Sequence, residues 1–301
     1  QHQHSSTHLT GFWVESIALF TSSFTQALIK RIKEKLIFCA ANLEVQPDKM
    51  HCSHELVNIL SCGMILAGLG HLIHHKGAQA AYGRHMVHKG PAWMVPAKVA
   101  WFLQEMPALL VPLLLSLSSH SSSSLGQSLL IWTFCLHYFQ RTFVYALLTR
   151  GRPFPVRVMV AAGFVCSLNG FLQSYYLLHC AQFEEEWTSK VHYQIGLILF
   201  YIGMAINIHS DYILRNLRKP GEVVYRIPKG GLFEYVSSAN YLGEILEWFG
   251  YALSTWSLPT LSFALFSFCF IGPRAYYHHR FYQENFKDYP VLRKALIPFI
   301  C

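Results

Sequence analysis

Seven long apolar runs constrain the fold of this chain more than any other feature. They lie at about residues 57–74, 99–118, 127–148, 158–181, 193–209, 234–254 and 257–273. A helix needs roughly 20 apolar residues to cross the hydrocarbon core of a bilayer. Only 13% of the 301 residues are charged, whereas an ordinary soluble domain carries about 25%. We therefore predict an all-α, polytopic membrane protein with seven transmembrane helices.

The connections between these runs alternate in charge. Lysine and arginine gather in every second connection, at 75–98, 149–157 and 210–233, and in the segment 274–301. The other connections are serine-rich, acidic or uncharged. Because positive charge marks the cytoplasmic side, the C-terminus is predicted to be cytosolic. The formal net charge of +8 suits anionic lipid headgroups or a phosphate-bearing cofactor better than nucleic acid, since no nucleic-acid-binding fold is visible.

Residues 1–49 are expected to be an extension outside the functional core, which we place at 50–301, starting at Met50. Segment 11–28 is mildly apolar, but Glu15 and many serines and threonines interrupt it, and KRIKEK follows. A signal peptide or an eighth span is the alternative interpretation of this segment.

Eight cysteines are scattered along the chain, and several lie inside predicted spans. None forms a CxxC pair, which indicates neither a disulfide framework nor a zinc site. We expect buried, reduced thiols.

A polar stripe occurs in the apolar segment that follows the basic loop within residues 207–248. Asn240, Glu244 and Glu247 stand at i, i+4 and i+7, so they share one face of a helix. Ionisable groups at membrane depth are costly and are usually kept for a ligand or a reaction. With the basic loop beside it, the stripe favours a site for a large anionic cofactor at the membrane surface. The alternative is a polar seam that only packs two helices together.

Two further spans carry polar groups among apolar neighbours. WFLQE places Gln104 and Glu105 in one span, and HYFQRTFVY places Tyr138, Arg141 and Tyr145 on one face of the next. Glu105 and Tyr138 are candidates for a hydrogen-bonded acid pair that polarises a substrate carbonyl. A structural hydrogen bond between two helices is an equally good interpretation.

The sequence TRGRPFPVR offers guanidinium groups at a cytosolic helix end. Arg150 and Arg152 flank Gly151, which allows close approach of a phosphate to the backbone. The same charges would also arise from the positive-inside bias alone. No GxGxxG follows a strand, so a Rossmann domain is not predicted.

Histidines suggest a competing metal site. His71, His74 and His75 have the HxxHH spacing of membrane di-iron enzymes, and His85, His88, His278 and His279 are predicted on the same side. Such enzymes need several boxes to supply about eight imidazoles, and the other boxes are missing here. Interfacial histidines are the preferred interpretation.

Long ordered blocks of the chain resemble the steroid 5α-reductase family. These blocks are AYGRH, WFLQE, CLHYFQRTFVYALL, RGRPFP, NIHSDYILRNLRKPGE, YRIPKGGLFEYVSSANYLGEILEWFGYALSTWSLP and HHRFYQENFKDYPVLRKALIPFI. The resemblance covers about residues 57–301. Tyr212, HHRFY at 278–282 and the ALIPFI ending are most similar to the type 2 members. Residues 1–49 have no counterpart in the family pattern.

The resemblance implies a multi-pass enzyme of the endoplasmic reticulum membrane, with a cavity for cofactor and steroid. It implies NADPH-dependent reduction of the 4,5 double bond of 3-oxo-Δ4 steroids such as testosterone. The family's catalytic pair matches Glu105 and Tyr138, and its steroid-contacting residues match Tyr82, Trp101 and Gln104. Its cofactor-binding residues match Arg141, Tyr145, Arg150, Arg152, Asn207, Asp211, Arg218, Tyr225, Arg226, Asn240, Glu244, Trp248, Arg274, His278 and Tyr282. The cofactor part falls mainly within 141–301.

The sequence leaves other functions open. An S-adenosylmethionine-dependent membrane methyltransferase of related fold is one alternative, although the many arginines favour a cofactor with several phosphates. A sterol-binding membrane protein without catalytic activity is another. The sequence indicates neither the preferred steroid nor whether the protein is a monomer or an oligomer.

Overall fold

The computed structural model describes residues 52–74, 93–119, 124–184, 186–217, 222 and 224–300. All of them belong to one unit, Cys52–Cys301. The predicted extension 1–49, the start of the core at Met50, and the predicted site residues Tyr82 and Arg218 lie outside the described residues.

Helices make up most of the described structure, 77% of it. The long helices are α2 (His54–His74), α3 (Ala97–Ser118), α4 (Leu125–Phe139), α6 (Val156–Tyr175), α7 (Val191–Asn216), α8 (Ala239–Thr255) and α9 (Leu258–Asn285). The short ones are the π-helical η3 (Gln140–Tyr145) and η4 (Tyr176–Cys180), the 3₁₀-helical η5 (Trp187–Ser189) and η6 (Gly231–Glu234), and α5 (Ala146–Leu148). Strands β1 (Met94–Val95) and β2 (Phe154–Pro155) pair antiparallel, with Met94 opposite Pro155.

Each predicted apolar run coincides with a helix. Five helical segments are long and apolar enough to cross a membrane: His54–His74, Ala97–Ser118, Val156–Cys180, Val191–Asn216 and Leu258–Asn285. Two runs fall short of that length, because η3 interrupts the α-helix after α4 and because α8 has only 17 residues. The prediction of an all-α polytopic membrane protein is confirmed, whereas the count of seven spans stays a prediction.

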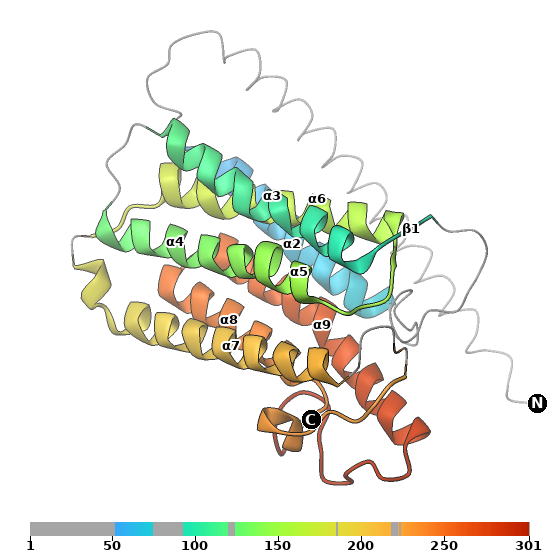
Figure 1. The fold of residues 1–301 in the computed structure, drawn as a ribbon. Helices are drawn as coiled ribbons and strands as arrows, with labels where there is room; N and C mark the ends of the chain where they lie inside the picture. Colours follow the sequence, from blue (N-terminus) through green and yellow to red (C-terminus); the bar gives the residue numbers. More distant parts are fainter. Residues whose placement is uncertain are drawn as a thin grey trace, which may run out of the picture. The chain divides into compact units, whose positions relative to one another are not determined.

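The helices pack in pairs, some of which are adjacent in the sequence and some of which are far apart in it. Helix α3 packs mainly against α6, α2 packs against α9, and α7 lies beside α8 (Figure 1). Helices α4 and α5, joined by η3, form one rod that runs between α3 and the α7–α8 pair (Figure 1). This arrangement gathers polar side chains from α3, α4, α6 and α8 inside the bundle.

Four glycines bring the backbones of α7 and α8 into contact. Gly196 and Gly203 lie two turns apart on α7, as do Gly243 and Gly250 on α8. A Cβ atom on Gly203 would lie 2.5 Å from the Glu247 backbone nitrogen. Backbones approach this closely only where no side chain separates them. The pair therefore sets the position of the α8 polar stripe with little freedom.

Aromatic side chains fill the core next to this pair. Trp248 on α8 lies edge-on to Phe263 of α9, with ring centroids 4.6 Å apart, and contacts Phe134 of α4. Trp248 and Tyr251 are fully buried. Rings from α4, α8 and α9 thus pack around one centre. An aromatic side chain typically buries about 150–250 Å² of surface, so this cluster holds the three helices together.

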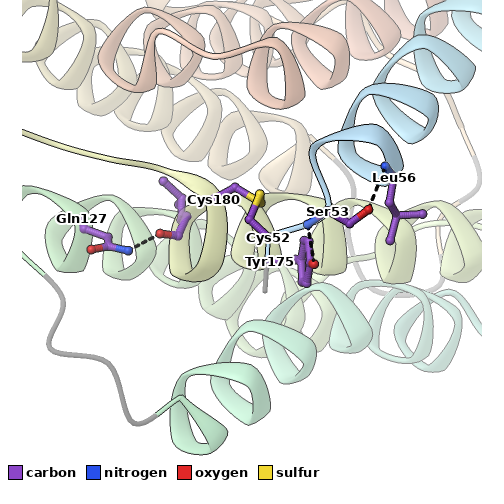
Figure 2. The surroundings of a disulfide bond; sticks show 7 residues. Cys52, Ser53, Leu56, Gln127, Tyr175 and Cys180 are labelled. Carbon is purple, nitrogen blue, oxygen red and sulfur yellow. Dashed lines mark hydrogen bonds between the residues drawn. A yellow bond between two sulfur atoms is a disulfide. The ribbon is translucent and has the colours of Figure 1, made fainter. Parts of the chain in front are cut away.

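A disulfide bond joins Cys52, just before α2, to Cys180 at the end of η4 (Figure 2). The prediction that all cysteines are reduced is wrong for this pair. The two residues are 128 positions apart, and their Cα atoms lie 4.9 Å apart because the ends of α2 and η4 meet. Spacing motifs register only cysteines that are close in sequence, so they could not indicate this pairing. Cys62, Cys135, Cys166 and Cys269 are free.

Hydrogen bonds hold the chain around the disulfide. The backbone nitrogen of Ser53 donates to the Tyr175 hydroxyl at 3.1 Å, and the Ser53 hydroxyl accepts from the Leu56 backbone nitrogen (Figure 2). Gln127 on α4 donates to the Leu177 carbonyl (Figure 2). One end of α2 is thus tied to α6 and η4 by covalent and polar contacts.

Candidate active site

A cavity of about 620 Å³ lies among α3, α4, α6, α8 and α9. This volume is within the range of about 300–1,000 Å³ that is usual for small-molecule sites. Its wall is mostly apolar, with Val158, Val165, Phe263, Phe266 and Phe270 among the lining side chains. Its polar groups include Gln104, Glu105, His137, Tyr138, Cys166 and Glu244. A few polar groups in an apolar wall suit an apolar ligand that carries one polar end.

Glu105 lies on α3 and is 8% exposed. Its carboxyl oxygens accept hydrogen bonds from Gln104 Nε2 at 3.4 Å and from the Cys166 thiol at 3.7 Å. Both partners are weak, one because of its length and the other because sulfur is a weak donor. The carboxyl group therefore retains capacity for a stronger partner inside the cavity.

Tyr138 lies on α4 and is 2% exposed. Its hydroxyl oxygen accepts a hydrogen bond of 2.9 Å from Asn169 Nδ2 on α6. No hydrogen bond joins Tyr138 to Glu105 among the described residues, so the predicted hydrogen-bonded acid pair does not form. The two groups instead line the same cavity and face it with separate partners.

Arg141 follows in η3, where the helix widens. Its guanidinium group pairs with Asp211 of α7 at 3.3 Å and lies over the ring of Tyr145, 4.1 Å from the centroid. The ring of Trp101 is 4.9 Å away on another side. The π-helical turn changes the side-chain register, so Tyr138 lines the large cavity while Tyr145 lines a second one.

The polar stripe on α8 divides between two roles. Asn240 donates to Asp211 Oδ1 at 3.4 Å, and Glu244 lines the large cavity. Glu247 is fully buried, and its Oε1 lies within hydrogen-bond distance of His137 Nδ1, at 2.6 Å. The helix-seam interpretation therefore applies to Glu247, whereas Asn240 and Glu244 face cavities.

A second cavity, of about 340 Å³, adjoins the first. Its lining is richer in polar groups and includes Tyr145, Thr149, Arg150, Asp211, Arg215, Asn240 and His278. His278 lines both cavities, so the two are neighbours at that side chain. Arginines at this end suit the phosphates of a ligand that extends from one cavity into the other.

The predicted site residues fall into three groups. The large cavity is lined by Trp101, Gln104, Glu105, Tyr138, Glu244, Arg274 and His278. The second cavity adds Tyr145, Arg150, Asp211 and Asn240. Neither lining contains Arg141, Arg152, Asn207, Tyr225, Arg226, Trp248 or Tyr282.

The residues of the third group contact the site or its surroundings in other ways. Asn207 donates to the Asn240 carbonyl at 3.0 Å, and Trp248 is part of the aromatic core. Arg152 lies over the ring of Tyr225, 5.2 Å from the centroid. Arg226 pairs with Glu222, and Tyr282 stacks on Tyr289.

Several polar residues at the site were not predicted. They are His137, Cys166, Asn169 and Gln173. The amides at 169 and 173 stand at i and i+4 within an apolar run, which is the same signal that marked Asn240 and Glu244. His137 also stands at i and i+4 with Arg141, so the same signal could have marked it.

Comparison with known proteins places the chain in a family. The sequence model of the family described as 3-oxo-5-alpha-steroid 4-dehydrogenase matches residues 152–301. The 3-oxo-5-alpha-steroid 4-dehydrogenase 2 of Sus scrofa is 56% identical over 245 residues, which cover 80% of this chain and 96% of that protein. The chain belongs to the 3-oxo-5-alpha-steroid 4-dehydrogenase family. The resemblance found in the sequence blocks is confirmed.

Two human relatives locate the chain within the family. It is 53% identical to the human 3-oxo-5-alpha-steroid 4-dehydrogenase 2 over 244 residues, covering 80% of this chain and 96% of that protein. It is 46% identical to the human 3-oxo-5-alpha-steroid 4-dehydrogenase 1 over 229 residues, covering 75% and 88%. The greater similarity to the type 2 members agrees with Tyr212 and the C-terminal blocks.

Proposed function

We propose that this chain reduces the 4,5 double bond of 3-oxo-Δ4 steroids, with NADPH as the reductant. One observation carries the proposal: a largely apolar cavity of about 620 Å³ holds Glu105 and Tyr138 in its wall. Its apolar wall suits the steroid ring system, and its two acidic groups suit one carbonyl. The family relationship supports the same reaction.

The residues around the second cavity fit a dinucleotide. Arg150 and Arg215 line it, and Arg274 lines the adjoining cavity near the shared His278. Guanidinium groups would hold the phosphates, and Asp211 with Asn240 would hydrogen-bond sugar hydroxyls or the amide end. When bound, NADPH supplies the hydride that is added to the α face of steroid carbon 5.

The protein's own contribution is to polarise the carbonyl. The Tyr138 hydroxyl donates a hydrogen bond to the steroid 3-oxo group, and a protonated Glu105 donates a second. Both withdraw electron density from the enone, which makes carbon 5 electrophilic. The enolate is then protonated at carbon 4 by solvent or a neighbouring acid. The apolar wall excludes water, so each donor has a larger effect than in solution.

The test is a direct assay of membranes that contain the chain. Incubation with testosterone and NADPH should yield a 5α-reduced product, identified by mass spectrometry and by the stereochemistry of the ring junction. Matched membranes without the chain provide the background. A 5β product, or consumption of S-adenosylmethionine in place of NADPH, would contradict the proposal. Sterol binding without NADPH consumption would favour a non-enzymatic role.

We also infer an endoplasmic reticulum location with a cytosolic C-terminus. The basic segments 149–157, 210–233 and 274–301 support this orientation. A C-terminal epitope tag on sealed microsomes should be cleaved by added protease without detergent. Protection of the tag would reverse the inferred orientation.

A further inference from the structure

Two buried amide side chains on α6 lie next to Tyr138 but line neither cavity described above. Asn169 is 0% exposed and Gln173 is 1% exposed. An amide at membrane depth is costly unless it is hydrogen-bonded. Their position beside a group that faces the cavity calls for a physical explanation.

Three hydrogen bonds connect these amides into one chain across three helices. Gln173 Nε2 donates to the Pro259 carbonyl of α9 at 3.0 Å and to Asn169 Oδ1 at 3.0 Å. Asn169 Nδ2 in turn donates to the Tyr138 hydroxyl oxygen at 2.9 Å. The chain therefore runs from α9 through α6 to α4.

The Pro259 carbonyl determines the direction of every hydrogen bond in this chain. A carbonyl oxygen can only accept, so the amide nitrogen of Gln173 must face it. The same nitrogen then faces Asn169, whose oxygen must accept, and the Asn169 nitrogen is left to face Tyr138. Rotating the Gln173 amide would bring two oxygens together. In the present orientation the Gln173 Oε1 has no hydrogen-bond partner in the described part of the chain.

The consequence concerns the single proton of the Tyr138 hydroxyl. Because the oxygen accepts from Asn169, the proton is not used in that bond. The hydroxyl has no second hydrogen-bond partner among the residues that the structure describes. Tyr138 lines the cavity, so a carbonyl oxygen inside it is the available acceptor. Accepting one hydrogen bond also makes a hydroxyl a better donor in the next.

We propose that Asn169 and Gln173 are positioning residues that keep the Tyr138 proton directed to the substrate carbonyl. The inference rests on the proposed role of Tyr138 as the carbonyl donor. The alternative is that the amides only fasten α6 to α4 and α9. The two roles make different predictions. A positioning residue affects kcat only when the Tyr138 hydroxyl is present, whereas a residue that only joins the helices affects the enzyme equally without that hydroxyl.

A double-mutant cycle with Tyr138→Phe tests the proposal. Asn169→Leu removes the donor, and Asn169→Asp keeps the acceptor for Gln173 but turns the bond to Tyr138 around. Each should lower kcat for the 3-oxo-Δ4 steroid roughly tenfold, equivalent to about 1.4 kcal/mol, with the NADPH dissociation constant and the melting temperature of the cofactor-bound enzyme retained. In the Tyr138→Phe background the same changes should lower kcat less than twofold.

Ser174→Ala is the matched control on the same helix. Ser174 is 2% exposed, and its hydroxyl donates to the Gly170 carbonyl rather than to Tyr138. This variant should leave kcat unchanged in both backgrounds. The comparison of kcat between the Tyr138 and Tyr138→Phe backgrounds is made with whichever Asn169 variant retains NADPH binding.

The outcomes separate this inference from the proposed function. Equal losses of kcat in both backgrounds would overturn the positioning role and leave that of Tyr138 intact. Unchanged kcat in a folded Asn169 variant would overturn it too. Unchanged kcat in Tyr138→Phe alone would instead contradict the proposed role of Tyr138 as the carbonyl donor, and absence of a 5α-reduced product from the unsubstituted protein would contradict the proposed function. A loss that is present with Tyr138 and absent with Phe supports the proposal.

Discussion

The two sides of the helix bundle are held together by different means. On one side, α7 and α8 touch through their backbones, and Cβ atoms at Gly196 or Gly250 would lie only 2.4 or 2.5 Å from the facing helix. On the other side, α2, α3, α6 and α9 approach less closely, since a Cβ at Gly170 or Gly68 would lie 3.0 or 3.1 Å from the facing backbone, and these helices line a cavity of about 620 Å³. The seam between α7 and α8 has no room for a ligand, whereas the second side encloses a cavity.

The difference shows that one side of the bundle fixes the position of site residues, whereas the other side provides the cavity. Asn240 and Glu244 belong to the closely packed pair, although they face the cavities. Their helix cannot shift without separating two backbones in contact. On the open side the facing backbones are farther apart, and the Cys52–Cys180 disulfide ties that side at one end. Four changes can break or sharpen this comparison.

Filling the α7–α8 seam should have the largest effect. In Gly250→Val the new Cβ would meet the Phe200 backbone nitrogen at 2.5 Å, so the helices must separate. We expect loss of folded protein, beyond the about 1–3 kcal/mol usual for overpacking. Yield after detergent extraction and the melting temperature measure it. Gly272→Val on α9 is the control, because nothing lies within 4 Å of a Cβ there. Equal melting of the two variants would refute the comparison.

Cutting the buried pair on α8 should have the next largest effect. Glu247→Ala leaves the buried His137 Nδ1 without its hydrogen-bond partner, which costs about 1–3 kcal/mol, and more for a charged group. The melting temperature should fall while residual folded enzyme keeps its NADPH affinity. Glu244→Ala, one turn away, should do the reverse: retained melting and weakened NADPH binding. A variant of Glu247 that melts normally would show that the seam does not depend on this pair.

Removing the hydroxyl on the open side should leave the fold intact. Tyr138→Phe deletes the carbonyl donor but keeps the ring that packs on Phe134 and Trp248. Turnover should fall by roughly 10²–10³-fold, as for loss of one oxyanion donor. Unchanged NADPH binding and melting temperature are the controls. A lowered melting temperature with normal turnover would assign Tyr138 to packing alone.

Opening the disulfide should have the smallest effect of the four. Cys180→Ser releases α2 from η4 and should lower the free energy of unfolding by about 2–4 kcal/mol. Thermal melting with and without a reducing agent measures it, because reduction should reproduce the loss in the unsubstituted protein but not in Cys180→Ser. Cys62→Ser, which changes an exposed free cysteine, is the control. A reductant effect that persists in Cys180→Ser would exclude this bond as its source.

Apolar length predicted the helices well because each run is a local property. The run 57–74 became α2, and 158–181 became α6 with η4. The count of membrane spans was less accessible, because the π-helical turn at 140–145 and the brevity of α8 depend on packing rather than composition. A one-residue widening of a helix leaves no clear mark in hydropathy.

The site was partly predictable for the same reason. Glu105, Tyr138 and Glu244 could be named from polar letters inside apolar runs and from the resemblance, and they line one cavity. Their partners required the fold: His137 for Glu247, Asn169 for Tyr138, and Cys180 for Cys52. Each of these contacts joins residues at least 31 positions apart, so no local pattern indicates it.

The widened turn η3 sets the register between the two cavities through backbone geometry. If the same residues formed a regular α-helix, everything after the turn would rotate by about 100° around the axis relative to Tyr138. Tyr145 and Arg150 would then leave the second cavity while Tyr138 stayed in the first. The two cavities would lose their alignment, although no side chain that lines them would have changed.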